Sequence, residues 1–274
     1  MSSMFGIILA LTSSVFREAA TTIGKSRVMR HEESIYTMGF LNLFWVSVFF
    51  LAIAVFIRGE FILALASLPT LGARILLEVI QAHVTMKAIA CSDRSTFGFL
   101  RIWTLPLLLV VDVFLGYTIG VYQMFGISFI VLAFIFLFIN HGIRKKGGGL
   151  VMFTALNAVA TISLFKYNIT YFNSVETEQL IVSLIILLYF YLMARHVAHE
   201  KPLYFFKKPA FFLQSFAMGI ASVMLSFAML FAPASVITTV KRSSTILWSI
   251  LSGNFYFHEK KFTIKLVSFI LIVA

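Results

Sequence analysis

The sequence predicts an all-α polytopic membrane protein with ten transmembrane helices, arranged as two inverted five-helix repeats. Its composition is the first reason: of 274 residues, 60% are hydrophobic, only 12% are charged, and the mean hydropathy is +0.97. A water-soluble fold of this length cannot bury so much apolar surface. The apolar residues also run for whole helix lengths, as from 35 to 57, instead of alternating as in a transmembrane β-barrel. Soluble enzymes, disordered chains and free nucleic-acid-binding domains are therefore excluded.

Ten segments have the length and apolar character of a spanning helix, which needs ~20 largely apolar residues. They are 4–24, 35–57, 61–90, 97–116, 121–139, 150–172, 179–195, 209–231, 235–257 and 262–274. Polar or helix-breaking residues separate them. The last segment gives about 20 Å of helix against ~30 Å of hydrocarbon. We expect either a chain that stops inside its last helix or a naturally short helix that thins the bilayer.

Lysine and arginine are distributed unevenly between alternate loops. One set of loops has Arg58 alone, whereas the other set has Lys25, Arg27, Arg30, Arg94, Arg144, Lys145, Lys146, Arg195, Lys201, Lys207, Lys208, Lys260 and Lys261. The positive-inside rule places the basic loops in the cytoplasm and, with ten spans, both termini outside. This asymmetry accounts for the net charge of +11, so the basic balance does not indicate a nucleic-acid partner.

The two halves of the chain match weakly but in a consistent order. The matched pairs, at offsets of 141 and 149 residues, are Arg101 with Arg242, Thr104 with Thr245, and Arg17 with Lys166. We therefore divide the chain into a first repeat (1–143), a charged and glycine-rich linker (144–149) and a second repeat (150–274). Five spans per repeat is an odd number, so the repeats have opposite orientations in the membrane. Secondary transporters use such inverted repeats for alternating access around a midplane site.

Charged residues inside the predicted spans are the candidate functional residues, because a charge at the bilayer centre costs about 2.5–3.5 kcal/mol on insertion scales. Lys241 and Arg242 lie on a polar face of the ninth span, whose members are Thr238, Lys241, Thr245, Ser249 and Ser252. Two cations without an acid nearby in sequence favour an anionic ligand, to which a guanidinium offers two parallel hydrogen bonds. The alternative is that both pair with acids on other helices, such as Glu78 or Asp112, and only hold the bundle together.

Three further sets of intramembrane charges are candidates. Arg74 and Glu78 are four residues apart in the third span and can form an ion pair. That pair is either structural or, through Glu78, involved in proton coupling. Arg17 and Lys166 occupy equivalent places in the two repeats, so symmetry directs both toward a central cavity, as binding groups or as scaffold. In the alignment of the two repeats, Arg101 matches Arg242 of the basic pair in the ninth span. It is therefore a further candidate for binding the anion.

Metal and cofactor chemistry have no support in the sequence. The single cysteine, Cys91, cannot form an internal disulfide or a two-thiol zinc site. His31-Glu32-Glu33 and His258-Glu259 lack the His-Glu-x-x-His pattern. We expect no cofactor and no metal.

Ten helices in two five-helix repeats resemble the drug/metabolite transporter superfamily, in particular its EamA-type members. Segment 234–259 is similar to that family's ninth helix, with a small-residue start and an end near an aromatic or glycine residue and a glutamate; 95–133 looks like the same unit in the first half. The Lys241-Arg242 pair resembles the Lys-Arg pair of the nucleotide-sugar and triose-phosphate translocator branch, where the pair holds substrate phosphate. The sequence departs from that branch at Leu100-Arg101, and its charge distribution puts the termini on the side opposite to characterised relatives.

These features and this resemblance lead us to expect a secondary transporter, not an enzyme, that moves a small, polar, anionic metabolite by alternating access. The substrate-binding residues would be Lys241, Arg242, Thr245, Ser249, Arg101, Arg17 and Lys166. One alternative is an exporter of amino acids or of cationic or neutral metabolites, with the basic pair structural. Others are a membrane-embedded lipid-phosphate enzyme and a non-transporting scaffold or receptor.

The expected partners are the small-molecule substrate and the lipid bilayer, without nucleic acid. A homodimer is left open. The expected location is a bacterial inner (plasma) membrane, because the chain is compact and has almost no tails.

Overall fold

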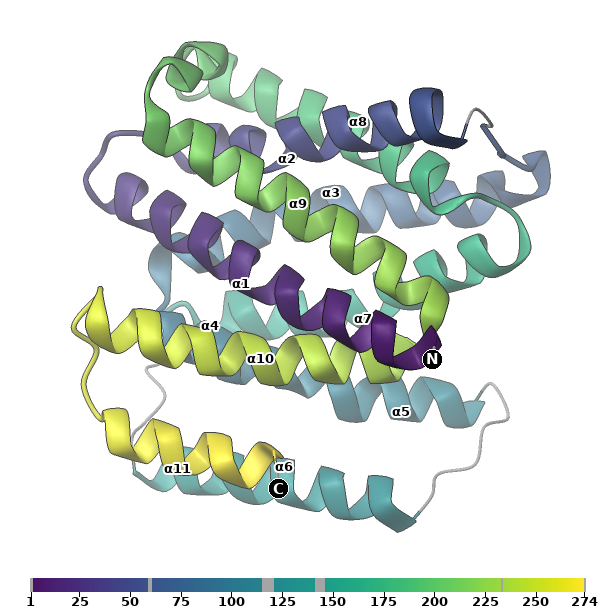
Figure 1. Cartoon of the computed structure of the whole chain (residues 1–274). Coiled ribbons are helices and arrows are strands. Elements are labelled where there is room, and N and C mark those ends of the chain that lie inside the picture. The colour runs from purple at the N-terminus through teal and green to yellow at the C-terminus, as the bar shows by residue number, and fades with distance from the viewer. Residues whose placement is uncertain (1, 59–60, 115–120, 141–145, 233, 274) are drawn as a thin grey trace.

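The computed structural model is a bundle of helices over the residues it describes, which are 2–58, 61–114, 121–140, 146–232 and 234–273. Figure 1 shows the helices lying roughly side by side, with the connecting loops gathered at two ends. In chain order the elements are α1 (Ser2–Met29), α2 (Ile35–Ala52), the π-helix η1 (Ile53–Arg58), the 3-10 helix η2 (Leu65–Ser67), α3 (Leu68–Cys91), α4 (Arg94–Leu100), the 3-10 helix η3 (Arg101–Trp103), α5 (Thr104–Phe114), α6 (Val121–Ile139), α7 (Gly148–Tyr171), α8 (Val175–His196), the 3-10 helix η4 (Pro202–Lys207), α9 (Pro209–Phe231), α10 (Ala234–Phe255) and α11 (Phe262–Val273).

The two ends of the bundle differ in charge. One end, on the left in Figure 1, has the loops that follow α1, α8 and α10. We call it the basic end, because it holds the exposed cations Arg30, Lys146, Arg195, Lys201, Lys207 and Lys260. The opposite end has the segments 61–64 and 172–174.

Seven helices are long and apolar enough to cross a membrane, which fits a multi-pass membrane protein. The other three predicted spans correspond to α6, α10 and α11. Of these, α10 has 22 residues but its polar face lowers its hydropathy, and α11 has 12 residues. In the predicted linker 144–149, positions 144 and 145 lie outside the described residues, and α7 begins at Gly148.

The second helix of each half begins with the same type of cap. Ser34 precedes α2, Ser174 precedes α8, and each hydroxyl accepts a hydrogen bond from the backbone N–H three residues later. Such a cap satisfies one of the N–H groups that a helix start leaves free. The first residues of α2 are also held by the segment that follows α8, and those of α8 by the segment that follows α2. Glu200 accepts from Ser34 N at 3.0 Å, and Ser174 N donates to Ile62 O at 3.2 Å.

The third and fourth predicted spans contain irregular segments that the apolar pattern does not reveal. The third was expected to be continuous from 61, yet α3 begins only at Leu68 and has Pro69 in its first turn. Proline fits there because the first turn needs no N–H donor from it. The fourth span is divided by η3, which precedes Pro106. Pro106 has no N–H to donate to the carbonyl oxygen of Ile102, four residues earlier, and its ring crowds that carbonyl. The resulting break places Arg101 at the start of a 3-10 turn.

The helices pack in a definite set of pairs. α1 packs against α9 and α10, and α7 packs against α3 and the α4–η3–α5 segment. α2 packs against α8, and α4 packs against α10 so closely that a Cβ on Gly98 would lie 2.3 Å from Ser249 Oγ. α6 and α11 lie side by side along one flank (Figure 1). With α6 and α11 on the flank, the other helices gather around the centre of the bundle.

Candidate functional site

A cavity of ≈ 270 Å³ lies at the centre of the bundle. Its walls come from α1, α2, α3, η3, α7, α8, α9 and α10, whereas α6 and α11 contribute no described lining residue. The polar and charged lining residues are Arg17, Arg74, Glu78, Gln81, Thr85, Arg101, Thr161, Gln179, Ser183, Ser222, Ser226, Thr238, Lys241 and Arg242. Five of these are cations, and among the described lining residues Glu78 alone carries a carboxylate.

Four of the five cations have no counter-ion in the described ranges. Arg17, Arg101, Lys241 and Arg242 form no ion pair there, although Lys241 lies within electrostatic reach of Glu78 and of the other three. They come from three elements, α1, η3 and α10, and lie close enough together for their charges to act on one another. The arrangement is therefore strongly electropositive, and like charges held together in a low-dielectric bundle favour an anion between them.

Several polar atoms of this group are buried without a hydrogen-bond partner among the described residues. They are the Nε atoms of Arg17, Arg101 and Arg242, and Thr238 Oγ1. Arg242 and Thr238 are 3% and 1% exposed. Native proteins leave few buried polar groups unpaired, because each costs about 1–3 kcal/mol. Three guanidinium Nε atoms and one hydroxyl in the cavity wall thus lack a partner among the described residues.

Arg74, the fifth cation, is neutralised from another helix. Its Nη1 lies 2.9 Å from Glu178 Oε1, and both side chains are buried. The i, i+4 partner expected from the sequence, Glu78, is 3.9 Å away and partly exposed. Glu178 also accepts hydrogen bonds from Asn168 (2.8 Å) and Asn173 (2.6 Å). This buried network joins α3, α7 and α8 towards the opposite end, so the Arg74 charge is not available to a ligand as the other four are.

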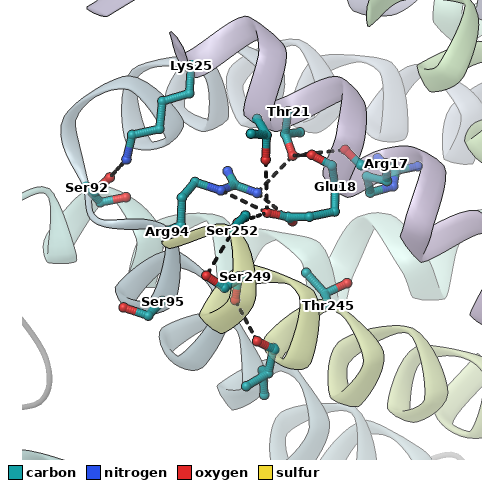
Figure 2. Close-up of polar contacts among 12 residues, drawn as sticks. Arg17, Glu18, Thr21, Lys25, Ser92, Arg94, Ser95, Thr245, Ser249 and Ser252 are labelled. Carbon is teal, nitrogen blue, oxygen red and sulfur yellow. Dashed lines mark hydrogen bonds and ion pairs between the residues drawn. The ribbon is translucent and has the colours of Figure 1, made fainter. Parts of the chain in front are cut away.

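A second buried ion pair links α4 to α1 on the side of the cavity nearer the basic end (Figure 2). Arg94, the first residue of α4, donates to both carboxylate oxygens of Glu18 on α1, at 2.6 and 3.2 Å. Ser252 on α10 donates to the same carboxylate at 2.6 Å, and Thr21 accepts from Arg94 at 2.8 Å. Lys25 donates to the carbonyl oxygen of Ser92. Three helices are therefore tied together between the cavity and the basic end.

The start of α4 is held by a second carboxylate from the last loop. Glu259 accepts hydrogen bonds from the backbone N–H groups of Arg94 and Ser95, and from Lys265 Nζ at 3.0 Å. A carboxylate suits this position because helix N-terminal N–H groups lack partners and carry partial positive charge. Glu259 thus fixes α4 in the position from which Arg94 reaches Glu18.

The predicted substrate residues fall into two groups. Lys241, Arg242, Arg101 and Arg17 line the cavity, as do Arg74 and Glu78. The cavity lining does not include three others, Thr245, Ser249 and Lys166, and each of them donates to a backbone carbonyl at 2.7–2.9 Å. The polar face of α10 is therefore divided: its first half faces the cavity, and its second half packs towards α4 and α1.

Sequence reasoning missed two residues of these networks. Arg94 was counted as a loop cation, yet it is 1% exposed and points inward. Glu178 lay outside the predicted seventh span, because that span was started one residue later. An available signal was the capping pattern Ser174-Val-Glu-Thr-Glu178, which places acids in the first turn of a helix. Asp112, the other acid considered as a partner of the basic pair, has a side chain outside the described part of the structure.

Among the described residues, no group of three or more His, Cys, Asp or Glu side chains is placed to hold a metal ion. Comparison with models of known protein families gives no match for this chain, and comparison with curated proteins gives none either. The cavity, with its four uncompensated cations, is the feature on which a function can be argued.

Proposed function

We propose that this chain is a secondary transporter of the drug/metabolite transporter type that carries a small anionic metabolite across the membrane by alternating access. The observation that carries the proposal is the set of four uncompensated cations around one central cavity: Arg17, Arg101, Lys241 and Arg242. A charge-assisted hydrogen bond contributes about 1.5–3 kcal/mol, so an anion can satisfy the unpaired guanidinium donors and offset the repulsion between them. A cavity of ≈ 270 Å³ is smaller than most pockets for drug-sized molecules, which favours a small cargo.

The pattern of helix pairs supports two inverted repeats. If α1, α2, α3, α4–α5 and α6 correspond to α7, α8, α9, α10 and α11, then exchanging the halves turns the α1–α9 contact into the α7–α3 contact. The same exchange leaves the contacts α2–α8, α4–α10 and α6–α11 unchanged, because the two helices of each pair swap places. The matching Ser34 and Ser174 caps fit the same relation. Such symmetry gives a transporter two related conformations, open to opposite sides.

The two buried ion pairs fit the roles of gates at the two ends. Arg94–Glu18 lies towards the basic end, and Arg74–Glu178 lies towards the opposite end, with the cavity between them. A carrier must open one end at a time, and a buried pair with supporting hydrogen bonds gives each closed end a distinct contact to break. Arg101 and Arg242 lie seven and eight residues into α4–η3 and α10, which start at opposite ends, so both reach a similar depth of about 11 Å.

Thermal stability of the purified protein in detergent tests the proposal. The panel consists of sugar phosphates, nucleotide sugars, dicarboxylates, amino acids and cationic drugs. A ligand at 100 times its dissociation constant should stabilise the folded protein by ~2.7 kcal/mol if it binds only that state. We expect an anion to stabilise the protein, and Lys241→Gln/Arg242→Gln to weaken that anion about 10- to 100-fold, since it removes charge-assisted donors.

The matched control is Arg30→Gln/Lys260→Gln, which removes the same two charges from exposed positions at the basic end. It should leave anion binding unchanged. Stabilisation by amino acids or cations that persists in Lys241→Gln/Arg242→Gln would make the basic pair structural and favour the exporter alternative. Uptake of the stabilising anion into proteoliposomes then separates a transporter from a receptor, which would bind without transport.

A further inference from the structure

A second pocket lies on the surface of the basic end, away from the central cavity. It has a volume of ≈ 480 Å³ and is lined by residues from the end of α8 and from the segment that leads into α9. Figure 1 shows this connection between α8 and α9 at the basic end. Its side chains come from the last turns of α8 and from the connecting segment: Tyr191, Arg195, Lys201, Leu203, Tyr204 and Lys207. None of these residues lines the central cavity.

The charge of this pocket is entirely positive among its described lining residues. Arg195, Lys201 and Lys207 are exposed cations, and the lining contains no carboxylate. The nearest acid in the sequence, Glu200, is already engaged with the start of α2: it accepts from Ser34 N at 3.0 Å and from Ser34 Oγ at 2.6 Å. The three cations are thus arranged around one hollow without internal compensation, which favours a ligand with at least one negative charge.

The connecting segment is anchored so that its apolar side chains face in two directions. Phe205 and Phe206 point inward, where they pack against Phe211 and Phe44 with ring centroids 5.1 and 4.7 Å apart. The preceding pair, Leu203 and Tyr204, is 55% and 60% exposed. Because Phe205 and Phe206 are fixed inside the bundle, Leu203 and Tyr204 are held outside it, beside the cations. The pocket therefore has one apolar edge and one basic edge.

The pocket lies at the end of a candidate membrane span, where the membrane–water interface is expected. α8 is a candidate span, and Tyr191 and Arg195 lie on the same face of its last turns, four residues apart. An aromatic ring one turn deeper than a cation matches the order of the interface, where tyrosines lie at headgroup level and basic side chains extend to the water. Lys207 Nζ lies 4.7 Å from the centre of the Tyr204 ring, which keeps this cation above the apolar edge.

We infer that this pocket binds the phosphodiester headgroup of an anionic phospholipid from the leaflet at the basic end, with Arg195, Lys201 and Lys207 around the phosphate and Leu203 and Tyr204 against the acyl chains. Basic pockets at cytoplasmic helix ends are suited to such headgroups, and acyl chains give Leu203 and Tyr204 an apolar environment that water does not. A free phosphate would use only the basic edge. This site is separate from the proposed transport cavity and does not depend on its function.

The test compares lipids on the purified full chain. Native mass spectrometry and thermal unfolding in detergent are measured with phosphatidylglycerol, phosphatidylcholine and soluble glycerol phosphate. We expect phosphatidylglycerol to be retained and to raise the melting temperature, and the other two to have little effect. Arg195→Gln/Lys201→Gln/Lys207→Gln should weaken retention by roughly 100-fold, since each cation near an anionic lipid contributes about a factor of five.

The matched control is Arg30→Gln/Lys146→Gln/Lys260→Gln, which removes one arginine and two lysines from other exposed positions at the same end. It should retain phosphatidylglycerol as the unaltered chain does. An equal loss in both triple variants would overturn the specific site, because it would show attraction by overall charge. Equal stabilisation by glycerol phosphate would overturn the lipid assignment. If the triple variant fails to fold, Lys201→Gln alone should weaken retention about fivefold, and unchanged retention would contradict the proposal.

Discussion

Arg94 Nη2 lies 2.6 Å from Glu18 Oε2, so the first residue of α4 is bound to the middle of α1. Both side chains are buried, and Ser252 ties α10 to the same carboxylate. The pair joins residues 76 positions apart in the chain. It fixes how three helices meet between the cavity and the basic end, and the first prediction concerns its removal.

Glu18→Gln should destabilise the folded protein by roughly 3–5 kcal/mol, because it leaves the Arg94 cation buried without a counter-charge. The free energy of unfolding in detergent measures this. Glu32→Gln is the control: Glu32 pairs with Arg27 in a half-exposed position, and its loss should change the free energy by less than about 1 kcal/mol. The double variant Glu18→Gln/Arg94→Gln should be less destabilised than Glu18→Gln. Equal losses in Glu18→Gln and Glu32→Gln would contradict the structural role of the pair.

The two acids near Arg74 should have different effects when neutralised. Glu178→Gln removes the carboxylate that balances Arg74 and accepts from two asparagines, so it should lower stability by roughly 3–5 kcal/mol. Glu78→Gln should lower stability by less than Glu178→Gln, because Glu78 is partly exposed and 3.9 Å from Arg74. It should strengthen anion binding several-fold, because it removes a repelling charge from the cavity wall. Unfolding and ligand titration on both variants distinguish these effects. Weaker anion binding in Glu78→Gln would indicate that this carboxylate takes part in coupling.

Arg101 and Lys166 should differ as binding residues although each is a cation in a predicted span. Arg101 lines the cavity with an unpaired Nε, whereas Lys166 Nζ donates to the Met229 carbonyl oxygen at 2.8 Å. Arg101→Gln should weaken anion binding about 10-fold or more, and Lys166→Gln should leave it within about a factor of two. Isothermal titration with the stabilising anion measures both. A larger loss in Lys166→Gln would show that this residue reaches the ligand in another conformation.

Gly98→Ala should disrupt the contact between α4 and α10. The added Cβ would lie 2.3 Å from Ser249 Oγ and 3.3 Å from Ser249 Cβ. Ser249 must therefore turn away and give up its hydrogen bond to the Ile246 carbonyl oxygen, or the helices must move apart, at a cost of about 1–3 kcal/mol. Gly98→Ala/Ser249→Gly should recover part of this loss, which a double-mutant cycle measures. Gly72→Ala is the control in α3: no atom lies within 4 Å of its Cβ position, and the variant should be neutral or more stable by about 0.5–1 kcal/mol. If Gly98→Ala/Ser249→Gly were no more stable than Gly98→Ala, the direct contact between residues 98 and 249 would be contradicted.

Glu33 predicts a pH dependence of stability. This carboxyl lies in the loop between α1 and α2, and burial, together with the charge of Glu200, raises its pKa well above the usual value. A raised pKa means that the folded state holds the proton more tightly than the unfolded state. Its stabilising contribution is therefore present below the usual carboxyl pKa and is lost as pH rises through the raised value.

Glu33→Gln should remove this loss and stabilise the protein at neutral pH. Gln214 Oε1, which lies near Glu33, has no hydrogen-bond donor among the described residues, and the amide of Glu33→Gln would bring a donor to this place without a charge. Melting temperatures at about pH 5 and pH 8 should differ less in Glu33→Gln than in the unaltered chain. Glu32→Gln should keep the original difference. A pH profile unchanged by Glu33→Gln would assign the dependence to other groups.

The apolar character of the chain and the places of its helices could be predicted because both are local properties. A run such as Ile35–Ala52 shows its length and composition in the sequence itself. The pair Lys241-Arg242 could be selected for the same reason: two cations in an otherwise apolar helix need a polar environment, whatever surrounds them. The breaks before α3 and at η3 follow from Pro69 and Pro106, and weighing these prolines more heavily would have located them.

The tertiary structure alone decided which charges are neutralised and which face the cavity. Arg74 has an acid four residues away, yet its closest partner is Glu178, 104 positions distant. Arg94 follows a loop but is buried against α1, and Thr245 and Ser249 belong to the polar face of α10 but lie outside the cavity lining. Helical spacing fixes which side chains share a face, whereas contacts between helices depend on how their surfaces pack. The sequence by itself thus determined the all-helical, multi-pass class and most helix positions, and packing determined which four cations line the cavity without a counter-ion in the described residues.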